Sequence, residues 1–193
     1  MMKKYKLFGI INIIDLLVLV VIVLAAAFLG MKFLGGTDTE GAPEINITFT
    51  SKEVSDFVVD KLADECAATE ISDFIDQKQV DDNRVLDGYD DKYIEVAVAE
   101  GCRMYDDTEK IELGRCTNIK VSNSQSSIVE EGVWQTSGKP DYSWLEIKST
   151  VNGKVLDNGV EIGGETYLVG DYIVLRAGVA KIYIEITDIE VVD

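Results

Sequence analysis

Residues 10–31 constrain this chain most strongly, because the only polar side chains among them are Asn12 and Asp15. At about 1.5 Å per residue, a helix of this length reaches about 33 Å, which is enough to cross the hydrocarbon core of a bilayer. The sequence therefore predicts an N-terminal transmembrane helix over residues 10–34, preceded by a basic tail over residues 1–9.

The charges on either side of this segment predict its orientation. Three lysines lie within residues 1–9, whereas Asp38 and Glu40 follow the segment. Positive charge is retained on the cytoplasmic side, so we expect a cytoplasmic N-terminus and an extracytoplasmic main domain. A cleaved signal peptide is the alternative, since small residues at 25–27 resemble a cleavage site, and it predicts a soluble chain starting near Met31. The apolar stretch exceeds the roughly 7 to 15 residues of an export signal, which favours a retained anchor.

Asn12 and Asp15 are three residues apart and would share one face of the helix. One interpretation is a polar contact with a partner helix, because ionisable groups at membrane depth are costly. The other is that the hydrocarbon-spanning part begins at Leu16, which leaves both groups at the cytoplasmic interface.

The composition divides the chain into a basic anchor and an acidic body. Its 193 residues include 18 Lys and Arg, 35 Asp and Glu and no histidine, for a formal charge of −17; residues 1–36 carry +3, so the remainder carries −20. Without histidine there are no His-dependent nucleophiles and few zinc sites with mixed ligands. The acidic balance argues against nucleic acid and against anionic lipid on the main body. We therefore predict no catalytic residues, no metal, no cofactor and no nucleic-acid partner.

Residues 35–44 read as a linker and residues 45–193 as a β-rich extracytoplasmic domain, a small barrel or sandwich with one short helix. The capping-box spacing of Thr50 and Glu53 predicts that helix over residues 52–66. Asn-Gly pairs at 152–153 and 158–159 are hairpin signals. Strands are expected at 45–49, 93–98, 112–121, 144–151, 165–169, 172–176 and 181–191.

The last expected strand changes phase. Ile182, Ile184 and Ile186 point to one side, whereas Ile189 and Val191 are out of phase with them. A bulge or bend in the two residues between these sets would restore burial.

Both ends of the chain resemble a known family. Residues 7–17, Leu-Phe-Gly-Ile-Ile-Asn-Ile-Ile-Asp-Leu-Leu, resemble the opening of the bacterial DUF4330 family, and residues 157–171 with 184–191 are similar to its closing region. The helical stretch after Thr50 and the acidic run after Val80 look like expansions of the family pattern. The resemblance implies a single-pass envelope protein with a β-rich outer domain, associated with surface-polysaccharide production, and it supplies no catalytic residues.

Trp134, Tyr142 and Trp144 form an aromatic group in a stretch that also contains Gly138 and Pro140. On an exposed loop these rings would stack on sugars. The alternative is that they anchor the core or the loop, as large aromatic residues commonly do.

Two further groups have alternative interpretations. The acidic run at 81–91 offers oxygen ligands suited to calcium, but its order does not match an EF-hand loop, so a solvated loop is the alternative.

Cys102 and Cys116 would form a disulfide if their strands are neighbours, leaving Cys66 free. The other interpretation is that all three are buried thiols.

These observations favour a non-enzymatic envelope protein whose outer domain binds protein partners or other envelope components, or forms a homo-oligomer, with a possible link to surface polysaccharide. The alternative is a module that binds carbohydrate, or processes it with two carboxylates, a chemistry that needs no histidine.

Overall fold

A computed structural model gives the structure of this chain, which divides into two compact units, Met1–Asp38 and Thr39–Asp193. The described residues are 6–7, 11–12, 18–23, 42–81, 93–99, 101–130 and 133–192.

In the first unit, β1 (Lys6–Leu7) pairs with β2 (Ile11–Asn12), and residues 18–23 are helical. Asn12 lies opposite Lys6, and Asp15 lies outside the described residues. Among the described residues, no helix is long and apolar enough to span a membrane. Most of the expected helix over residues 10–34 lies outside the described residues, and the polar helix face stays a prediction.

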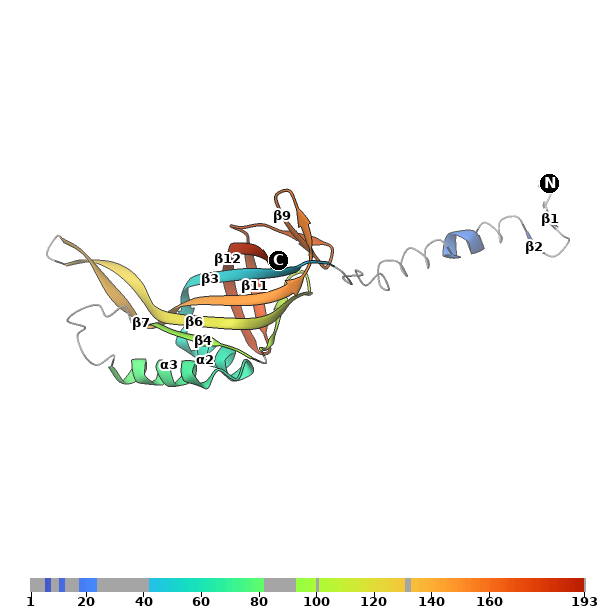
Figure 1. The fold of residues 1–193 in the computed structure, drawn as a ribbon. Helices are drawn as coiled ribbons and strands as arrows, with labels where there is room; N and C mark the ends of the chain where they lie inside the picture. The colour runs from blue at the N-terminus through green and yellow to red at the C-terminus, as the bar shows by residue number, and fades with distance from the viewer. Residues whose placement is uncertain are drawn as a thin grey trace, which may run out of the picture. The chain divides into compact units, whose positions relative to one another are not determined.

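The second unit is a closed antiparallel barrel with a helical hairpin and a small additional sheet (Figure 1). Six strands pair in the cyclic order β6, β5, β11, β12, β3, β7 and back to β6, while β4 pairs with β6 only. The barrel therefore confirms the β-rich domain that the alternating pattern predicts. The strands are β3 (Glu44–Ser55), β4 (Tyr93–Ala97), β5 (Arg103–Asp106), β6 (Ile111–Glu130), β7 (Val133–Asn152), β8 (Lys154–Leu156), β9 (Gly159–Ile162), β10 (Glu165–Tyr167), β11 (Tyr172–Ala177) and β12 (Ala180–Val192).

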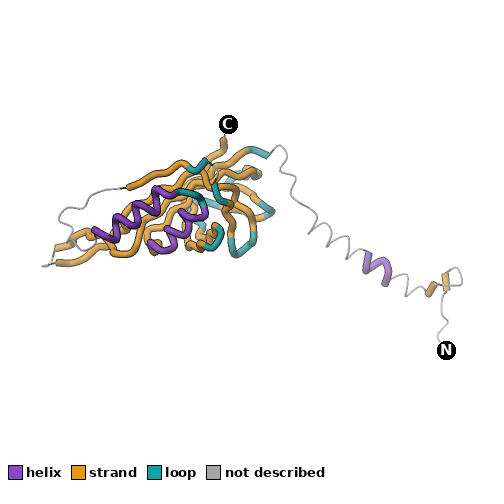
Figure 2. The backbone as a smooth tube through the Cα atoms, turned by 90° about the horizontal axis from the view of Figure 1, so that it is seen from below, coloured by secondary structure: helices purple, strands orange, loops and turns teal. Residues whose placement is uncertain are grey.

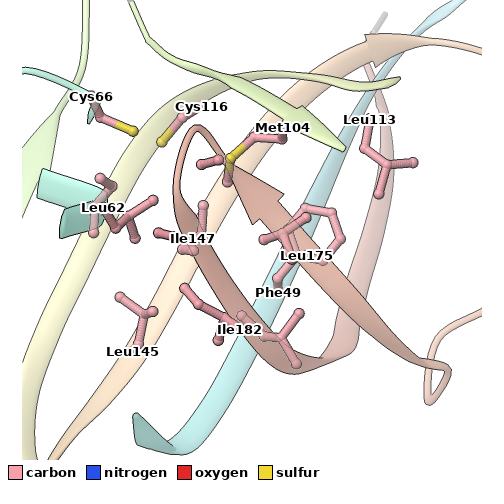
Figure 3. Close-up of a cluster of buried hydrophobic side chains, with 14 of the residues drawn as sticks. Phe49, Leu62, Cys66, Met104, Leu113, Cys116, Leu145, Ile147, Leu175 and Ile182 are labelled. Atoms are coloured by element: carbon pink, nitrogen blue, oxygen red, sulfur yellow. The ribbon is translucent and has the colours of Figure 1, made fainter. Parts of the chain in front are cut away.

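Alternation along each strand fills the barrel with apolar side chains and turns the intervening residues outward. In β3, for example, Ile45, Ile47 and Phe49 are fully buried. Figure 3 shows Leu62 of the helical hairpin among side chains of the barrel strands, such as Ile147. The hairpin and the barrel therefore share one core.

Two helices are present in this unit instead of the single one expected: α2 (Asp56–Glu65) and α3 (Thr69–Asp81). They lie side by side against the strands (Figure 2). The helix expected from residue 52 begins at Asp56 because β3 continues to Ser55, still paired with β7 after a register shift between Ser51 and Val54, so strand pairing overrides the capping-box signal. The missed helix α3 carries Ile71 and Ile75 on its buried face, a helical spacing in a stretch for which no element is predicted from the sequence.

The other local expectations give mixed results. The pairing of β12 with β3 shifts register between Ile186 and Asp188, which confirms the bulge expected from the phase change. The burial that this bulge was expected to restore is partial at Ile189 and is not seen at Val191, which is 43% exposed. Asn158-Gly159 lies at the turn of the hairpin between β8 and β9, whereas Asn152-Gly153 joins β7 to β8 without closing a hairpin. The alternating pattern predicts no strand at β5, β8 or β9, which are three or four residues long.

The cysteine pairing differs from the one expected. Cys66, at the C-cap of α2, forms a disulfide with Cys102, just before β5, while Cys116 is a buried free thiol. The expected neighbourhood of Cys102 and Cys116 is present, since the Cys116 amide donates to the Cys102 carbonyl at 3.0 Å. The sequence could not show that the turn after α2 also reaches this place, so both the Cys102–Cys116 pair and the three buried thiols are wrong.

Candidate functional site

The aromatic group predicted from the sequence is spread along β7 rather than gathered on a loop. Trp144 is half-buried on the outer face of the barrel, where its register partner is Ser122, which in turn faces Tyr93 on β4. The Lys120 ammonium lies 4.5 Å from the centre of the Tyr93 ring and 6.0 Å from that of Trp144. One lysine therefore makes cation–π contacts with both rings, and these contacts account for the position of the rings without a ligand.

The other two predicted residues lie further along the same strand. Tyr142 is 36% exposed and has the Lys139 ammonium 4.2 Å from its ring centre. The backbone of Trp134 pairs with Val129, and its side chain lies outside the described part of the structure. Beyond residue 125 the hairpin of β6 and β7 projects away from the barrel (Figure 1). Trp134 and Trp144 therefore occupy separate register positions, and the structure does not assemble the predicted group as a single site.

A different aromatic surface lies on the outer face of β5, β11 and β12, and we call it the tyrosine face. It consists of Tyr105, Tyr172, Tyr183 and Arg176. Tyr172 and Tyr183 are 57% and 66% exposed, and their rings stack with centres 5.4 Å apart and an interplanar angle of 16°. Exposed aromatic pairs of this kind mark binding surfaces more often than single exposed side chains do.

Two polar groups of the tyrosine face, on Tyr172 and Arg176, are held by neighbouring residues. The Tyr172 hydroxyl donates to the Glu185 carboxylate at 2.6 Å, and this hydrogen bond raises the pKa of Tyr172 above its usual value. The Arg176 guanidinium lies 4.9 Å from the centre of the Tyr105 ring, and its Nε donates to Asp107 at 2.9 Å. Tyr172 and Arg176 are therefore held in place without a ligand.

Asp107 is the acid on which the neighbouring cations converge. Its carboxylate accepts from Arg176 and also pairs with Lys181 and Lys110. Hydrogen bonds from Lys181 and Lys110 lower the pKa of Asp107 to about 2. A general acid for glycosidic cleavage needs the opposite shift, so this carboxylate is unsuited to that role.

Two buried acids have structural partners. Asp106 accepts from the backbone amide of Thr108 at 2.8 Å and from the hydroxyl of Tyr167 at 3.4 Å, which fixes the turn after β5 beneath β10. Ser143 donates to Asp56 at 2.6 Å and joins the start of α2 to β7. These contacts explain why both acids tolerate burial.

The predicted calcium ligands lie almost entirely outside the described residues, which include Asp81 at the end of α3 but not residues 82–92. Among the residues that the structure describes, no group of three or more Cys, Asp or Glu side chains is arranged to hold a metal ion.

The tyrosine face was missed because Tyr172 and Tyr183 lie eleven residues apart in what was expected to be two separate strands. A turn at Gly178-Val179 pairs Val174 with Tyr183, which places the two rings on a diagonal of one hairpin. The glycine and the strand phase contained this signal, but no hairpin was assigned there.

No family model, no curated protein and no solved structure matches this chain. The resemblance to DUF4330 therefore stays a prediction that rests on the residues quoted for it.

Proposed function

We propose that this chain is a non-enzymatic, membrane-tethered envelope protein whose β-rich unit binds a sugar chain through the tyrosine face. The observation that carries this proposal is the stacked and exposed pair Tyr172 and Tyr183. Aromatic rings offer flat apolar surface to the CH groups of a sugar, and the tyrosine hydroxyls supply polar edges. This function agrees with the polysaccharide association that the family resemblance implies.

The sequence supports the membrane tether, and the disulfide supports a location of the β-rich unit outside the cytoplasm. The apolar segment at 10–34 is long enough to cross a bilayer, and the basic tail before it favours a cytoplasmic N-terminus. The disulfide between Cys66 and Cys102 suits a compartment outside the cytoplasm, where such bonds persist.

Fractionation of cells that make the full-length chain tests the tether. We expect the protein to stay in the membrane pellet after washing with alkaline carbonate, and protease added to intact spheroplasts to digest the β-rich unit. Release into the carbonate supernatant, or protection of the unit until the cells are lysed, would contradict the proposed topology.

Binding of the full-length chain, held in detergent micelles, to a panel of immobilised bacterial oligosaccharides tests the sugar site. The double variant Tyr172→Ala with Tyr183→Ala should lose at least tenfold in affinity, because it removes both exposed rings. Tyr93→Ala is the matched control, since Tyr93 is 58% exposed on a different part of the barrel. Equal loss in the control, or binding only to a second copy of the chain, would overturn the proposal.

A further inference from the structure

The excess of negative charge in the outer part is small on the strands that carry the tyrosine face. Strands β5, β11 and β12 hold three Lys and Arg and four Asp and Glu, whereas the rest of residues 37–193 holds 11 and 30. One of the four acids, Asp106, is buried, so the exposed charges of these strands balance. The net acidity of the chain therefore conceals one surface that is close to neutral.

Two arginines on this surface, which we call the arginine pair, lie directly opposite each other. Arg103 on β5 is the register partner of Arg115 on β6, and both are exposed. Like charges in directly opposed positions destabilise a sheet. The two side chains diverge, since Arg103 approaches Glu112 at 3.7 Å while Arg115 donates to the Gly101 carbonyl at 3.1 Å. The diverging side chains separate the two charges, and both remain exposed to an anionic group of a ligand.

The arginine pair and the tyrosine face belong to one continuous surface of four neighbouring strands, β6, β5, β11 and β12. Tyr105 lies opposite Arg176, so two residues further along Arg103 lies opposite residue 178. Tyr183 lies opposite Val174, four residues from 178, and Tyr172 is six residues from 178. At about 3.3 Å per residue, Arg103 is therefore about 13 Å along the sheet from Tyr183 and about 20 Å from Tyr172. A ligand that contacts both the arginine pair and the stacked rings of Tyr172 and Tyr183 must be extended. A polymer fits this spacing better than a small anion does.

We propose that the sugar chain bound by this surface is acidic, with its carboxylates on Arg103 and Arg115 and its ring faces on Tyr172 and Tyr183. This inference rests on the proposed function and adds the chemical class of the ligand. The planar guanidinium fork matches a carboxylate in two parallel hydrogen bonds, and such bonds are stronger than neutral ones. The tyrosines favour a sugar polymer over a lipid surface, because they extend the site well beyond the charges.

Isothermal titration of the full-length chain in detergent micelles tests the inference with two probes, a galacturonate decamer and the neutral decamer maltodecaose. The acidic decamer should bind at least about tenfold more tightly, as expected for charge-assisted hydrogen bonds. The variant Arg103→Gln with Arg115→Gln should bring its affinity down to that of maltodecaose. Arg103→Lys with Arg115→Lys should keep an intermediate affinity, since the charge remains without the fork.

The matched control is Lys139→Gln with Lys154→Gln, which removes the same charge from positions on β7 and β8 away from the arginine pair and should leave both affinities unchanged. Equal affinity for the two decamers, with loss in Tyr172→Ala and Tyr183→Ala, would overturn the acidic class and leave the sugar site standing. Failure of both decamers to bind would overturn both proposals. Binding to phosphatidylglycerol vesicles with no response to either decamer would also overturn both and would identify a lipid surface instead.

Discussion

At the scale of single residues, Asp107 links three cations from separate parts of the chain. Arg176 comes from β11, Lys181 from β12 and Lys110 from the turn before β6. Such exposed pairs contribute little singly, and a shared acid is the arrangement in which they become measurable.

The low pKa of Asp107 predicts a specific dependence of stability on pH. Because this carboxyl titrates near 2 in the folded chain and near 3.9 when unfolded, its contribution is complete above pH 4 and is lost as the pH falls from about 4 to about 2. Asp107→Asn should therefore unfold at lower urea than the wild type at pH 7, and the difference should vanish near pH 2. Asp73→Asn on the exposed face of α3 is the control, and a difference that persists at pH 2 would contradict the role of Asp107.

Gly101 occupies a place that admits no side chain. A Cβ there would lie 1.6 Å from the carbonyl oxygen of Cys116, which is backbone and cannot move aside easily. Gly101→Ala should cost about 3 kcal/mol or more of unfolding free energy in urea titrations, as severe overpacking does. Gly164→Ala should cost only about 1 to 2 kcal/mol, because its strain comes from a φ of +91° with no atom within 4 Å. Equal costs for both variants would contradict this close approach.

At the scale of elements, the disulfide joins the helical hairpin to the entrance of β5. It closes a loop with a sequence separation of 36, so removing it as Cys66→Ala with Cys102→Ala should cost about 4 kcal/mol by the loop-entropy argument. The midpoint of urea unfolding measures this cost. Cys116→Ala, which removes a buried sulfur without a crosslink, should cost about 1 kcal/mol.

Thiol labelling gives an independent check of the pairing. Burial raises the pKa of Cys116 to about 12, so iodoacetamide at pH 8 should modify no cysteine in the folded chain and one after denaturation without reductant. Mass spectrometry should locate that label on Cys116. A label on Cys66 would show that Cys102 pairs with Cys116 instead.

The elements also show where the sequence was informative. Strands with strict alternation, such as β11 and β12, were predicted nearly in full, and the phase change after Ile186 correctly located a bulge. Helix α3 was missed because its average hydropathy is low and its buried face is narrow. The short strands β5 and β8 had too few residues for any period to be read.

At the scale of the whole molecule, one core joins the helical hairpin to the barrel, which predicts a single unfolding transition. Leu62 of α2 is fully buried, and Leu62→Ala should lower the unfolding free energy by about 2 to 5 kcal/mol. Helical circular dichroism and tryptophan fluorescence should change at the same urea concentration in both proteins. Loss of helix before the fluorescence change would show that the hairpin unfolds separately.

The candidate site needed the whole molecule before it could be recognised. Trp144 is conspicuous in the sequence because tryptophan is scarce, yet the Lys120 ammonium lies 6.0 Å from the centre of its half-buried ring. Arg103 and Arg115 have no pattern in the sequence, because a turn and a shift in register decide that they face each other. Net charge was misleading for the same reason, because a total for the chain does not show how the charges are distributed over its surface.

The crosslink between Cys66 and Cys102 has a further consequence for how this chain responds to cleavage. A single backbone cut anywhere between residues 67 and 101, which includes the acidic run, leaves both fragments covalently attached. Such a chain would migrate as one band on a denaturing gel and as two only after reduction. The barrel would keep every strand but one on the same polypeptide fragment as β5, and the disulfide would be the one covalent connection between β3 and the others.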